Sequence, residues 1–334
     1  MGDIITRKED HLKICTSEDV NSRKSLYWDS IDLAHCALPE INFDEVQTEA
    51  EFFGQTFSAP FLISSMTGGS PSGELINKTL AVCAQDKNPP MGVGSQRIAL
   101  EKRESCLFDL RKIAPKATLF ANIGAVQFNY GVSVEDCLWL SEKLEANAFI
   151  LHLNPLQEAI QNEGDRNFSS LLPKIENLKK SLNIPLIVKE VGCGIDPRSA
   201  RRLLECGVDA IDVAGKGGTH WGYIEGLRDS RRRELGMMFR DWGLDTPTLL
   251  KQLRETLPKD FPLIASGGVR NAVDAAKAIS LGANFVGFAL PFLMEAQKGE
   301  EAVRAFIDTQ IEGLKVALFC SGSKNIKDLQ HEKI

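Results

Sequence analysis

The sequence predicts an α/β fold in which eight strands and the helices between them close into a barrel, a (β/α)8 TIM barrel with an N-terminal extension. Two observations lead to this prediction. Short apolar runs recur along the chain as continuous runs rather than alternating patterns, which is typical of parallel strands covered on both faces. Amphipathic stretches of helical length separate these runs. The length of 334 residues suits one large barrel with insertions.

Eight apolar runs are expected to be the barrel strands, and most of them end in polar or glycine-rich residues. The predicted strands are Phe61–Met66, Met91–Val93, Thr118–Ala121, Ala148–Leu153, Pro185–Val188, Ala210–Val213, Pro262–Ala265 and Phe285–Ala289. The clearest predicted helices are Leu75–Gln85, Val134–Glu145, Leu171–Leu182, Ser199–Cys206, Thr248–Leu257 and Ala272–Leu281. An open, doubly wound sheet is the alternative. Such a sheet usually has fewer strands and a glycine fingerprint after the first one, which this sequence does not show.

Two segments lie outside the repeat. Residues 1–59 precede the first strand as an N-terminal extension. Residues 219–247 form a long connection between the sixth strand and its helix, and such a connection is usually a lid, a binding loop or a subunit contact. Because no Pro/Ser-rich linker or low-complexity tract interrupts the chain, we expect residues 1–334 to form a single domain.

The composition argues against several classes of protein. The formal net charge of −6 does not provide the broad basic field that nucleic-acid binding needs. None of the eight cysteines forms a C-x-x-C pair, which favours free thiols in a reducing cytoplasm. The first 13 residues lack the apolar core of a signal peptide, and no apolar run approaches the roughly 20 residues of a membrane span. We therefore expect a cytoplasmic protein with no nucleic-acid or membrane partner.

The ends of the seventh and eighth strands predict a phosphate site. Glycines at Gly267 and Gly268, followed by Val269 and a predicted helix, let backbone N–H groups approach an anion. Ala289 and Leu290, at the end of the eighth strand, can supply further N–H groups. These two strand ends are a frequent phosphate position in barrels. Ordinary turn glycines are the alternative, but two such turns at matching positions favour phosphate.

Polar residues also follow the fourth and fifth strands. Lys189 comes directly after an apolar run and would point into the barrel mouth, where it could pair with a phosphate, an electron-rich ring or Glu190. His152 and Asn154 are two positions apart, so they could face the same side of an extended chain. Their placement predicts ligand contacts at the mouth of the barrel.

Three further features are ambiguous when taken alone. Glu158 is a lone carboxylate and becomes a Mg²⁺ candidate only if a diphosphate supplies the other oxygens. Lys216 and Thr219 belong to a glycine-rich strand end that suits an anionic ligand but lacks the Walker A spacing. The mixed charges of residues 7–11 are typical of a solvated terminal segment.

Five short motifs occur in order along the chain, all but the first at a predicted strand end. They are Arg7-Lys8-x-x-His11, Ser65-Met66-Thr67-Gly68-Gly69, Gly94-Ser95-Gln96-Arg97, His152-Leu153-Asn154-Pro155-Leu156-Gln157-Glu158 and Gly215-Lys216-Gly217-Gly218-Thr219. Each motif alone is weak evidence for a family. With all five in order, the sequence closely resembles the type 2 isopentenyl diphosphate isomerases from residue 7 to about residue 290.

The resemblance implies an FMN-dependent barrel that needs Mg²⁺ and a reductant, typically NADPH, and that interconverts isopentenyl diphosphate and dimethylallyl diphosphate. The FMN-binding residues that it implies are Ser65, Met66, Thr67, Ser95, Asn122, Lys189, Thr219, Gly267, Gly268, Val269, Ala289 and Leu290. The substrate contacts that it implies are Arg7, Lys8, His11, Arg97, His152, Asn154 and Gln157. It further implies Glu158 as the Mg²⁺ ligand, His152 and Gln157 as catalytic side chains, and a homo-oligomer, either a tetramer or an octamer.

The chemistry of such a reaction can be argued physically. Moving the double bond requires adding a proton at one carbon and removing another two carbons away, through an intermediate that needs an electron-rich neighbour and no water. A reduced flavin can supply the electron density, with its N5 as the acid/base group and His152 as the alternative. Glu225, in the long connection, is a second acidic group expected near the ligand.

Two other functions stay open at this point. One is another FMN-dependent barrel oxidoreductase, such as a 2-hydroxy acid oxidase, or the related FMN-free IMP dehydrogenase. The other is a catalytically silent barrel that acts as a binding protein. The motifs Arg7-Lys8-x-x-His11 and Asn154-x-x-Gln157-Glu158 suit a diphosphate with Mg²⁺, which favours the isomerase.

Overall fold

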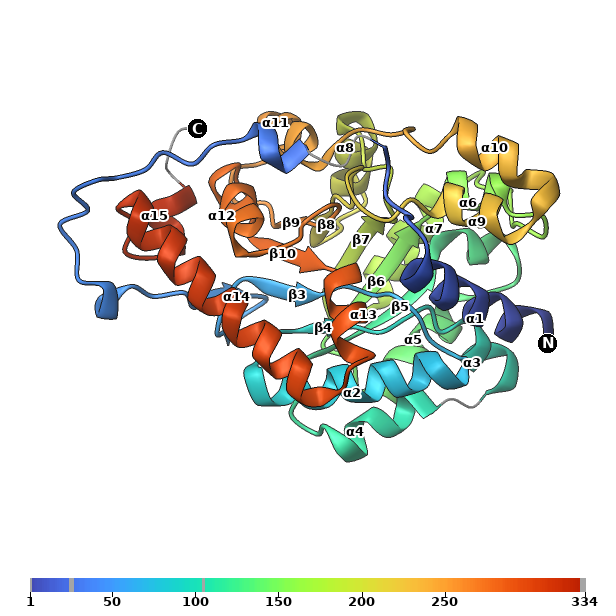
Figure 1. Ribbon diagram of the computed structural model, residues 1–334. Helices are drawn as coiled ribbons and strands as arrows, with labels where there is room; N and C mark the ends of the chain where they lie inside the picture. The colour runs from blue at the N-terminus through green and yellow to red at the C-terminus, as the bar shows by residue number, and fades with distance from the viewer. Residues whose placement is uncertain (1, 24–26, 104–105, 331–334) are drawn as a thin grey trace.

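Eight parallel strands close into a barrel in the order β10-β3-β4-β5-β6-β7-β8-β9 (Figure 1). The structure is a computed structural model that describes residues 2–23, 27–103 and 106–330, without the side chains of residues 2–4 and 106. The barrel strands are β3 (Phe61–Ile63), β4 (Met91–Gly92), β5 (Leu119–Gly124), β6 (Ala148–Leu153), β7 (Leu186–Glu190), β8 (Ala210–Asp212), β9 (Leu263–Ala265) and β10 (Phe285–Phe288). The predicted (β/α)8 barrel is confirmed, and the open-sheet alternative is wrong.

Every barrel strand is followed by one or more helical segments before the chain enters the next strand or ends. The α-helices are α1 (Gly2–Ser17), α2 (Pro71–Lys87), α3 (Arg97–Lys102), α4 (Leu110–Ile113), α5 (Val134–Leu144), α6 (Pro155–Ile160), α7 (Leu171–Ser181), α8 (Pro197–Glu205), α9 (Trp221–Arg228), α10 (Arg233–Met238), α11 (Thr246–Thr256), α12 (Ala272–Ser280), α13 (Leu290–Ala296), α14 (Glu300–Ser321) and α15 (Ile326–Gln330). Short 3-10 helices are η1 (Tyr27–Ser30), η2 (Phe43–Glu45), η3 (Cys106–Asp109), η4 (Ala125–Asn129) and η5 (Ser230–Arg232).

Two strands extend further than the apolar runs suggested. The prediction ended the third strand at Ala121, but β5 continues to Gly124 because its residues still pair with β6. Likewise β7 includes Lys189 and Glu190, which pair with the last residues of β6. Polar residues therefore lie inside the strands, because hydrogen bonds from the neighbouring strand set the strand's end rather than the hydropathy of its side chains.

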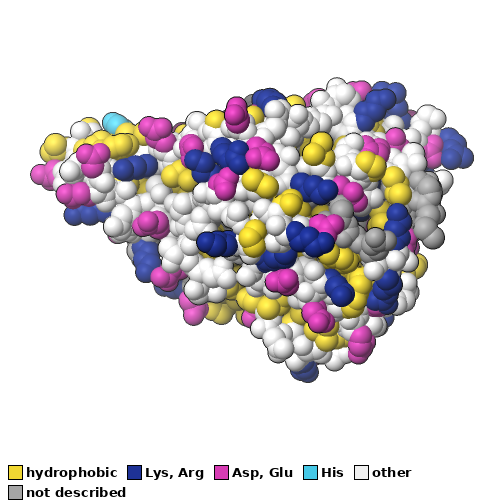
Figure 2. Space-filling model, turned by 90° about the horizontal axis from the view of Figure 1, so that it is seen from below, with side chains coloured by type: hydrophobic (Ala, Val, Ile, Leu, Met, Phe, Trp, Pro, Cys, Tyr) yellow, Lys and Arg dark blue, Asp and Glu magenta, His cyan; other side chains and the backbone are white. Residues whose placement is uncertain are grey.

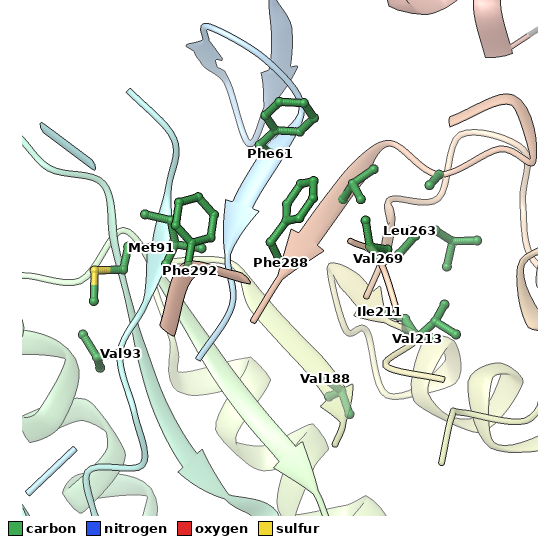
Figure 3. Packing of buried hydrophobic residues seen from close by; sticks show 14 of the residues in the cluster. Phe61, Met91, Val93, Val188, Ile211, Val213, Leu263, Val269, Phe288 and Phe292 are labelled. Atoms are coloured by element: carbon green, nitrogen blue, oxygen red, sulfur yellow. The ribbon is translucent and has the colours of Figure 1, made fainter. Parts of the chain in front are cut away.

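The larger hydrophobic core lies between the barrel and its helices (Figure 3). Phe61 of β3 and Phe288 of β10 contact each other edge to face, with ring centroids 5.3 Å apart. Phe292 of α13 packs against Phe288 at 6.1 Å, so the last strand, the first strand and the helix after them share one aromatic cluster. The barrel closes through the pairing of β10 with β3, and the aromatic cluster packs beside this seam.

A second core fills the N-terminal end of the barrel interior. Inward-facing residues from the starts of the strands form it, together with Phe52 and Phe57 of a small antiparallel hairpin, β1 (Ala50–Phe52) and β2 (Gln55–Phe57). The hairpin turns at Phe53 and Gly54, which both have positive φ, as a two-residue type I′ turn requires. Phe285 of β10 contacts both hairpin phenylalanines, so the hairpin plugs the floor of the barrel.

The N-terminal extension wraps the barrel. Figure 1 shows α1 on the side to which the strand arrows of β3 and β10 point. Trp28 of η1 is completely buried, and its Nε1 donates to Gly267 O at 3.2 Å. The chain then runs along α14, where Cys36 N donates to Cys320 O at 2.7 Å and Phe43 packs on Phe319. This stretch and the C-terminal helices form the narrow end of the molecule, also seen from below in Figure 2.

The long connection after β8 is structured, since it holds α9, η5 and α10. It also exposes apolar side chains, among them Met238 and Trp242, the latter 60% exposed. On the face shown in Figure 2, positive and negative side chains are interspersed. Seven of the eight cysteines are free thiols; the side chain of Cys106 lies outside the described residues. Among the helices of the described ranges, none has both the length and the apolar character of a membrane span.

Candidate active site

A cavity of about 520 Å³ opens at the C-terminal ends of the barrel strands, a volume typical of small-molecule sites. The structure brings every residue that the resemblance assigned to FMN, substrate or metal to the wall of this one cavity, whereas Lys216 and Glu225 do not line it. The residues brought together are Arg7, Lys8, His11, Ser65, Met66, Thr67, Ser95, Arg97, Asn122, His152, Asn154, Gln157, Glu158, Lys189, Thr219, Gly267, Gly268, Val269, Ala289 and Leu290. They come from segments as distant in sequence as α1 and the β10–α13 junction.

The strands position these side chains through their two-residue periodicity. Residues two apart on a strand face the same side, so the inward positions above the apolar floor can be read directly. They are Asn122 on β5, His152 on β6, Lys189 on β7, Asp212 on β8 and Ser266 directly after β9. One pleat above the apolar core, the barrel interior therefore changes from aliphatic and aromatic to polar.

The orientation of His152 follows from a chain of hydrogen bonds. The Asn122 side-chain amide donates to Val93 O at 3.1 Å, which turns its Oδ1 toward His152 Nδ1 at 2.9 Å. That nitrogen must then carry the proton, so Nε2 holds a lone pair. Burial, with the positive charges of Lys189 and Lys8, lowers the pKa of His152 to about 3. His152 is thus neutral near pH 7.

The N-terminal charge run is not a solvated tail. It lies on α1, which packs against α2 and α9 and buries Leu12 and Cys15. The amine of Lys8 donates to Gly68 O and, at 3.2 Å, to Ser95 O. Burial and the neighbouring Arg7 lower the pKa of Lys8 to about 7. The expectation of solvation is wrong because the charges share a helix with apolar residues that need the barrel to cover them.

Glu225 of α9 links the N-terminal helix to α6. Its carboxylate is 2% exposed and accepts from Gln157 Nε2 at 2.8 Å and from Arg228 at 2.7 Å. His11 Nε2 lies 2.9 Å away, an ion-pair distance at which the N–H is not aligned for a hydrogen bond. Burial alone would raise the pKa of Glu225, but His11, Gln157 and Arg228 hold it at about 2. Gln157 is consequently held in place by a fixed negative charge.

Glu158 lies in the first turn of α6 and lines the cavity. Its carboxylate accepts from Asn154 Nδ2 at 2.9 Å and from Asp165 N at 2.7 Å, and burial raises its pKa. The buried Asn154 Oδ1 next to it has no donor within the described part of the chain and can accept from a ligand or bind a cation. Within the part of the chain that the structure describes, no three His, Cys, Asp or Glu side chains are grouped to hold a metal ion. A metal here would therefore need ligand oxygens in addition to Glu158.

The glycine-rich strand ends form a backbone cradle. Gly267 and Gly268 have φ of +101° and +75°, and a Cβ on either would collide with the backbone of residues 215–217. For residues 267–269, no partner of the backbone N–H groups occurs in the described ranges. The first amides of α12 are not free in the same way, because the Asn271 side chain caps them. Backbone N–H groups of the loop, rather than the helix terminus, are thus available to an anion.

Two charged side chains that the sequence offered as possible partners of a ligand or of Lys189 have other partners in the structure. Lys216 lies outside the cavity wall, where its amine donates to Asp241 O at 3.0 Å and lies over the Tyr27 ring. The Glu190 carboxylate does not pair with Lys189 but accepts from the backbone N–H groups of residues 191–194 at 2.5 to 3.1 Å. Both side chains are anchors of loops at the cavity rather than ligands in it.

Some residues of the site were missed at the sequence level. Gln161 and Trp221 line the cavity without belonging to a quoted contact set. Asp212 lies below the cavity wall, and its carboxylate accepts from Ser266 Oγ at 2.6 Å. The sequence held a signal for Asp212, since a charged residue inside an apolar strand run is as unusual there as Lys189 is on β7.

Comparison with known proteins defines the class. The chain matches the family model described as FMN-dependent dehydrogenase over residues 134–334. A mandelate oxidase with a monooxide FMN adduct has a TM-score of 0.69 at 16% identity, over 93% of this chain and 92% of that chain. A lactate oxidase from Pediococcus acidilactici has a TM-score of 0.69 at 16% identity, over 98% and 93%. The structural likeness shows the fold, and the family model assigns the barrel to the FMN-dependent class.

Curated relatives narrow this class. The isopentenyl-diphosphate delta-isomerase of Nostoc sp. is 46% identical over 330 residues, which cover 98% of this chain and 94% of the relative. The isopentenyl-diphosphate delta-isomerase of Rickettsia africae is 44% identical over 333 residues, covering 99% and 97%. The chain belongs to the isopentenyl-diphosphate delta-isomerase family.

Proposed function

We propose that the protein interconverts isopentenyl diphosphate and dimethylallyl diphosphate in isoprenoid biosynthesis, with FMN and Mg²⁺ as cofactors. The observation that carries the proposal is that one cavity is lined both by the residues expected around a flavin and by those expected around a diphosphate. The near full-length identity to curated isomerases supports the same reaction.

The residues of the cavity fit FMN. Among the described residues, the buried hydroxyls of Ser64 and Ser65 and the backbone N–H groups of residues 267–269 have no hydrogen-bond partner. That loop, with Ala289 and Leu290, would hold the FMN phosphate. The remaining flavin contacts would be Ser65, Met66, Thr67, Ser95, Asn122, Lys189 and Thr219. Bound in its reduced form, FMN supplies electron density and an acid–base ring nitrogen for the isomerisation.

A second set of residues lining the cavity fits a diphosphate. Arg7, Lys8 and Arg97 are cations there, and a buried amine such as Lys8 gains most from an anionic partner. His11 would add a further contact. Glu158 and Asn154 Oδ1 offer the oxygen ligands that Mg²⁺ prefers, and the diphosphate would complete the shell.

The chain's own polar groups then orient the substrate and hold protons at defined atoms. His152 keeps its proton on Nδ1 and offers the lone pair of Nε2. Gln157, bound to both Asn154 and Glu225, presents its amide in one orientation. Leu12, Met66 and Trp221 also line the cavity, and such apolar side chains exclude water from the reacting carbons.

Other properties of the protein belong to the same proposal. NADPH would supply the electrons that reduce the flavin. We expect one domain over residues 1–334 and a cytoplasmic location, which the free thiols support. We also expect a homo-oligomer, a tetramer or an octamer, and the exposed Met238 and Trp242 of the long connection suit a subunit contact.

The test is a product assay with single omissions. Purified protein is incubated with isopentenyl diphosphate, FMN, Mg²⁺ and NADPH, and dimethylallyl diphosphate is measured. We expect product only when flavin, metal and reductant are all present. No product under reducing conditions, although the protein binds FMN, would point to another FMN-dependent oxidoreductase, and failure to bind FMN would point to a binding protein.

A further inference from the structure

A buried carboxylate lies beneath the cavity floor without a complete set of partners. Asp212 is 1% exposed, and its Oδ1 accepts from Ser266 Oγ at 2.6 Å and from Ala214 N at 3.3 Å. Its Oδ2 has no hydrogen-bond donor in the described ranges. A buried carboxylate oxygen without a donor is rare because it keeps its desolvation penalty. Something near Oδ2 must therefore compensate its charge.

The compensating group is Lys189. The two residues are register partners on β7 and β8, and Lys189 Nζ lies 4.0 Å from Asp212 Oδ2. The amine also donates to Glu190 O at 2.6 Å, so two contacts fix it. Lys189 lines the cavity, whereas Asp212 does not. Asp212 can therefore act on a bound ligand by holding Lys189 in place and by offsetting part of its positive charge.

The other charges near Lys189 do not replace Asp212. The carboxylate of Glu190 is taken up by four backbone N–H groups. On the side of β6, His152 is neutral, and Lys8 adds positive charge. Among the described residues, Asp212 is the one carboxylate within 4.0 Å of the Lys189 amine. Burial raises the pKa of Asp212, while Lys189 and the Ser266 hydroxyl act in the opposite direction.

We propose that Asp212 is a positioning residue, the buried counter-ion that fixes the Lys189 ammonium at the cavity floor and sets the positive charge felt by a bound flavin. The inference rests on the proposed binding of FMN. A positive charge beside a flavin favours its reduced, more negative form and so raises the midpoint potential. By offsetting part of the Lys189 charge, Asp212 would keep the potential lower than Lys189 alone would set it.

The test measures the flavin midpoint potential of the FMN-loaded protein by spectroscopic titration at pH 7. Asp212→Asn leaves Lys189 without its counter-ion, so the potential should move positive. Lys189→Met should move it negative. In the Lys189→Met background, Asp212 lacks the positive charge that lowers its pKa, so burial should keep its carboxyl neutral and Asp212→Asn should cause little further shift. Asp212→Glu, which keeps the charge, should restore most of the wild-type value.

The chain offers a matched control at the other end of the same strand. Asp209 immediately precedes β8 and pairs with Lys179 at 2.7 Å, but lies at the floor end of the barrel. Asp209→Asn removes an acidic group of the same pair type and should leave the midpoint potential unchanged. A shift equal to that of Asp212→Asn would mean that the potential responds to the net charge of the protein rather than to this pair.

A second measurement keeps the test valid if Asp212→Asn alone does not fold. Removing one partner of a buried pair leaves an uncompensated charge, so both single variants should melt at lower temperature than the wild type. The double variant has no such charge, and its apoprotein should melt above either single variant. Additive losses, or the same Asp212→Asn potential shift with and without Lys189, would overturn the inference. If the wild type binds no FMN, the proposed function fails instead.

Discussion

The same strands build both halves of the barrel interior, but the half at their N-terminal ends (the floor) is apolar and the half at their C-terminal ends (the mouth) is polar. Phe120, Ile187 and Ile264 face inward at the floor, where the β1–β2 hairpin covers them. Two residues further along each strand, about 7 Å higher, Asn122, Lys189 and Ser266 face the cavity. One pleat therefore separates the part of the barrel that stabilises the fold from the part that can bind and react.

This separation predicts that mutations will divide cleanly between the halves. Floor residues gain their free energy from burial and tight packing, so truncation there should lower stability and leave ligand contacts intact. Residues of the polar half are incompletely partnered and partly buried as charges, which lowers stability in the absence of ligand. Variants there should change ligand binding, turnover or pH dependence more than the melting temperature.

The largest effect is expected at the floor. Phe285 is completely buried between Phe52 and Phe57, so Phe285→Ala should lower the free energy of unfolding by about 3–5 kcal/mol. Thermal denaturation measures the loss of stability, and an FMN titration of the folded fraction measures whether ligand binding is kept. Phe285→Leu should cost less. A matching loss of FMN affinity in protein that remains folded would break the separation between floor and mouth.

The next effect concerns Glu158, the proposed Mg²⁺ ligand of the polar half. Glu158→Gln should lower Mg²⁺-dependent turnover by more than about 100-fold, because even groups behind a metal ligand are worth 10–100-fold. The bound flavin should remain, since Glu158 is not among the proposed flavin contacts. Turnover is measured against Mg²⁺ concentration, with the exposed Glu142→Gln as control. Loss of FMN from Glu158→Gln would instead mean that this carboxylate supports the fold.

Lys8 should make substrate binding at the mouth of the barrel depend on pH. The amine must be protonated to bind a diphosphate, and its pKa in the free protein is about 7. The ratio kcat/KM should therefore fall by about tenfold per unit as the pH rises above 7. Lys8→Arg keeps a charge at all these pH values and should flatten this limb. If kcat/KM of Lys8→Arg fell with pH as in the wild type, the pH dependence would belong to another group.

The last effect is confined to acid conditions and concerns stability. The pKa of His152 is about 3 in the folded protein and about 6.5 in the unfolded chain, so below pH 6.5 only the unfolded chain takes up the proton. This contribution to stability is therefore lost as the pH falls from 6.5 toward 3. His152→Asn should melt with a weaker dependence on pH in that window. The exposed His35→Asn serves as control and should behave as the wild type.

The barrel was predictable because each strand carries its own signal. A continuous apolar run such as Ala148–Leu153 identifies a strand covered on both faces, whichever residues pair with it. The residues after the runs could be grouped into a site because parallel strands end at the same face of a barrel. The chemical identity of the ligands, in contrast, came from resemblance, since spacing alone left Glu158 and the charges of residues 7–11 ambiguous.

The features that escaped prediction depend on contacts far apart in sequence. The helix α1 is stable because Leu12 and Cys15 are covered by the barrel, which the local charge pattern of residues 7–11 conceals. The pairing of Gln157 with Glu225 joins residues 68 positions apart. Phe52 and Phe57 flank a turn with glycine, which is a readable hairpin signal, but nothing local places that hairpin under the barrel floor.

The central claim is that the polar half of the interior moves protons on an isoprenoid diphosphate without net oxidation. The most direct measurement incubates the protein with isopentenyl diphosphate, FMN, Mg²⁺ and NADPH in deuterium oxide and follows product and NADPH together. We expect dimethylallyl diphosphate that carries solvent deuterium, with NADPH consumption ending once the flavin is reduced. Product free of deuterium, or NADPH consumed in proportion to product, would contradict the account.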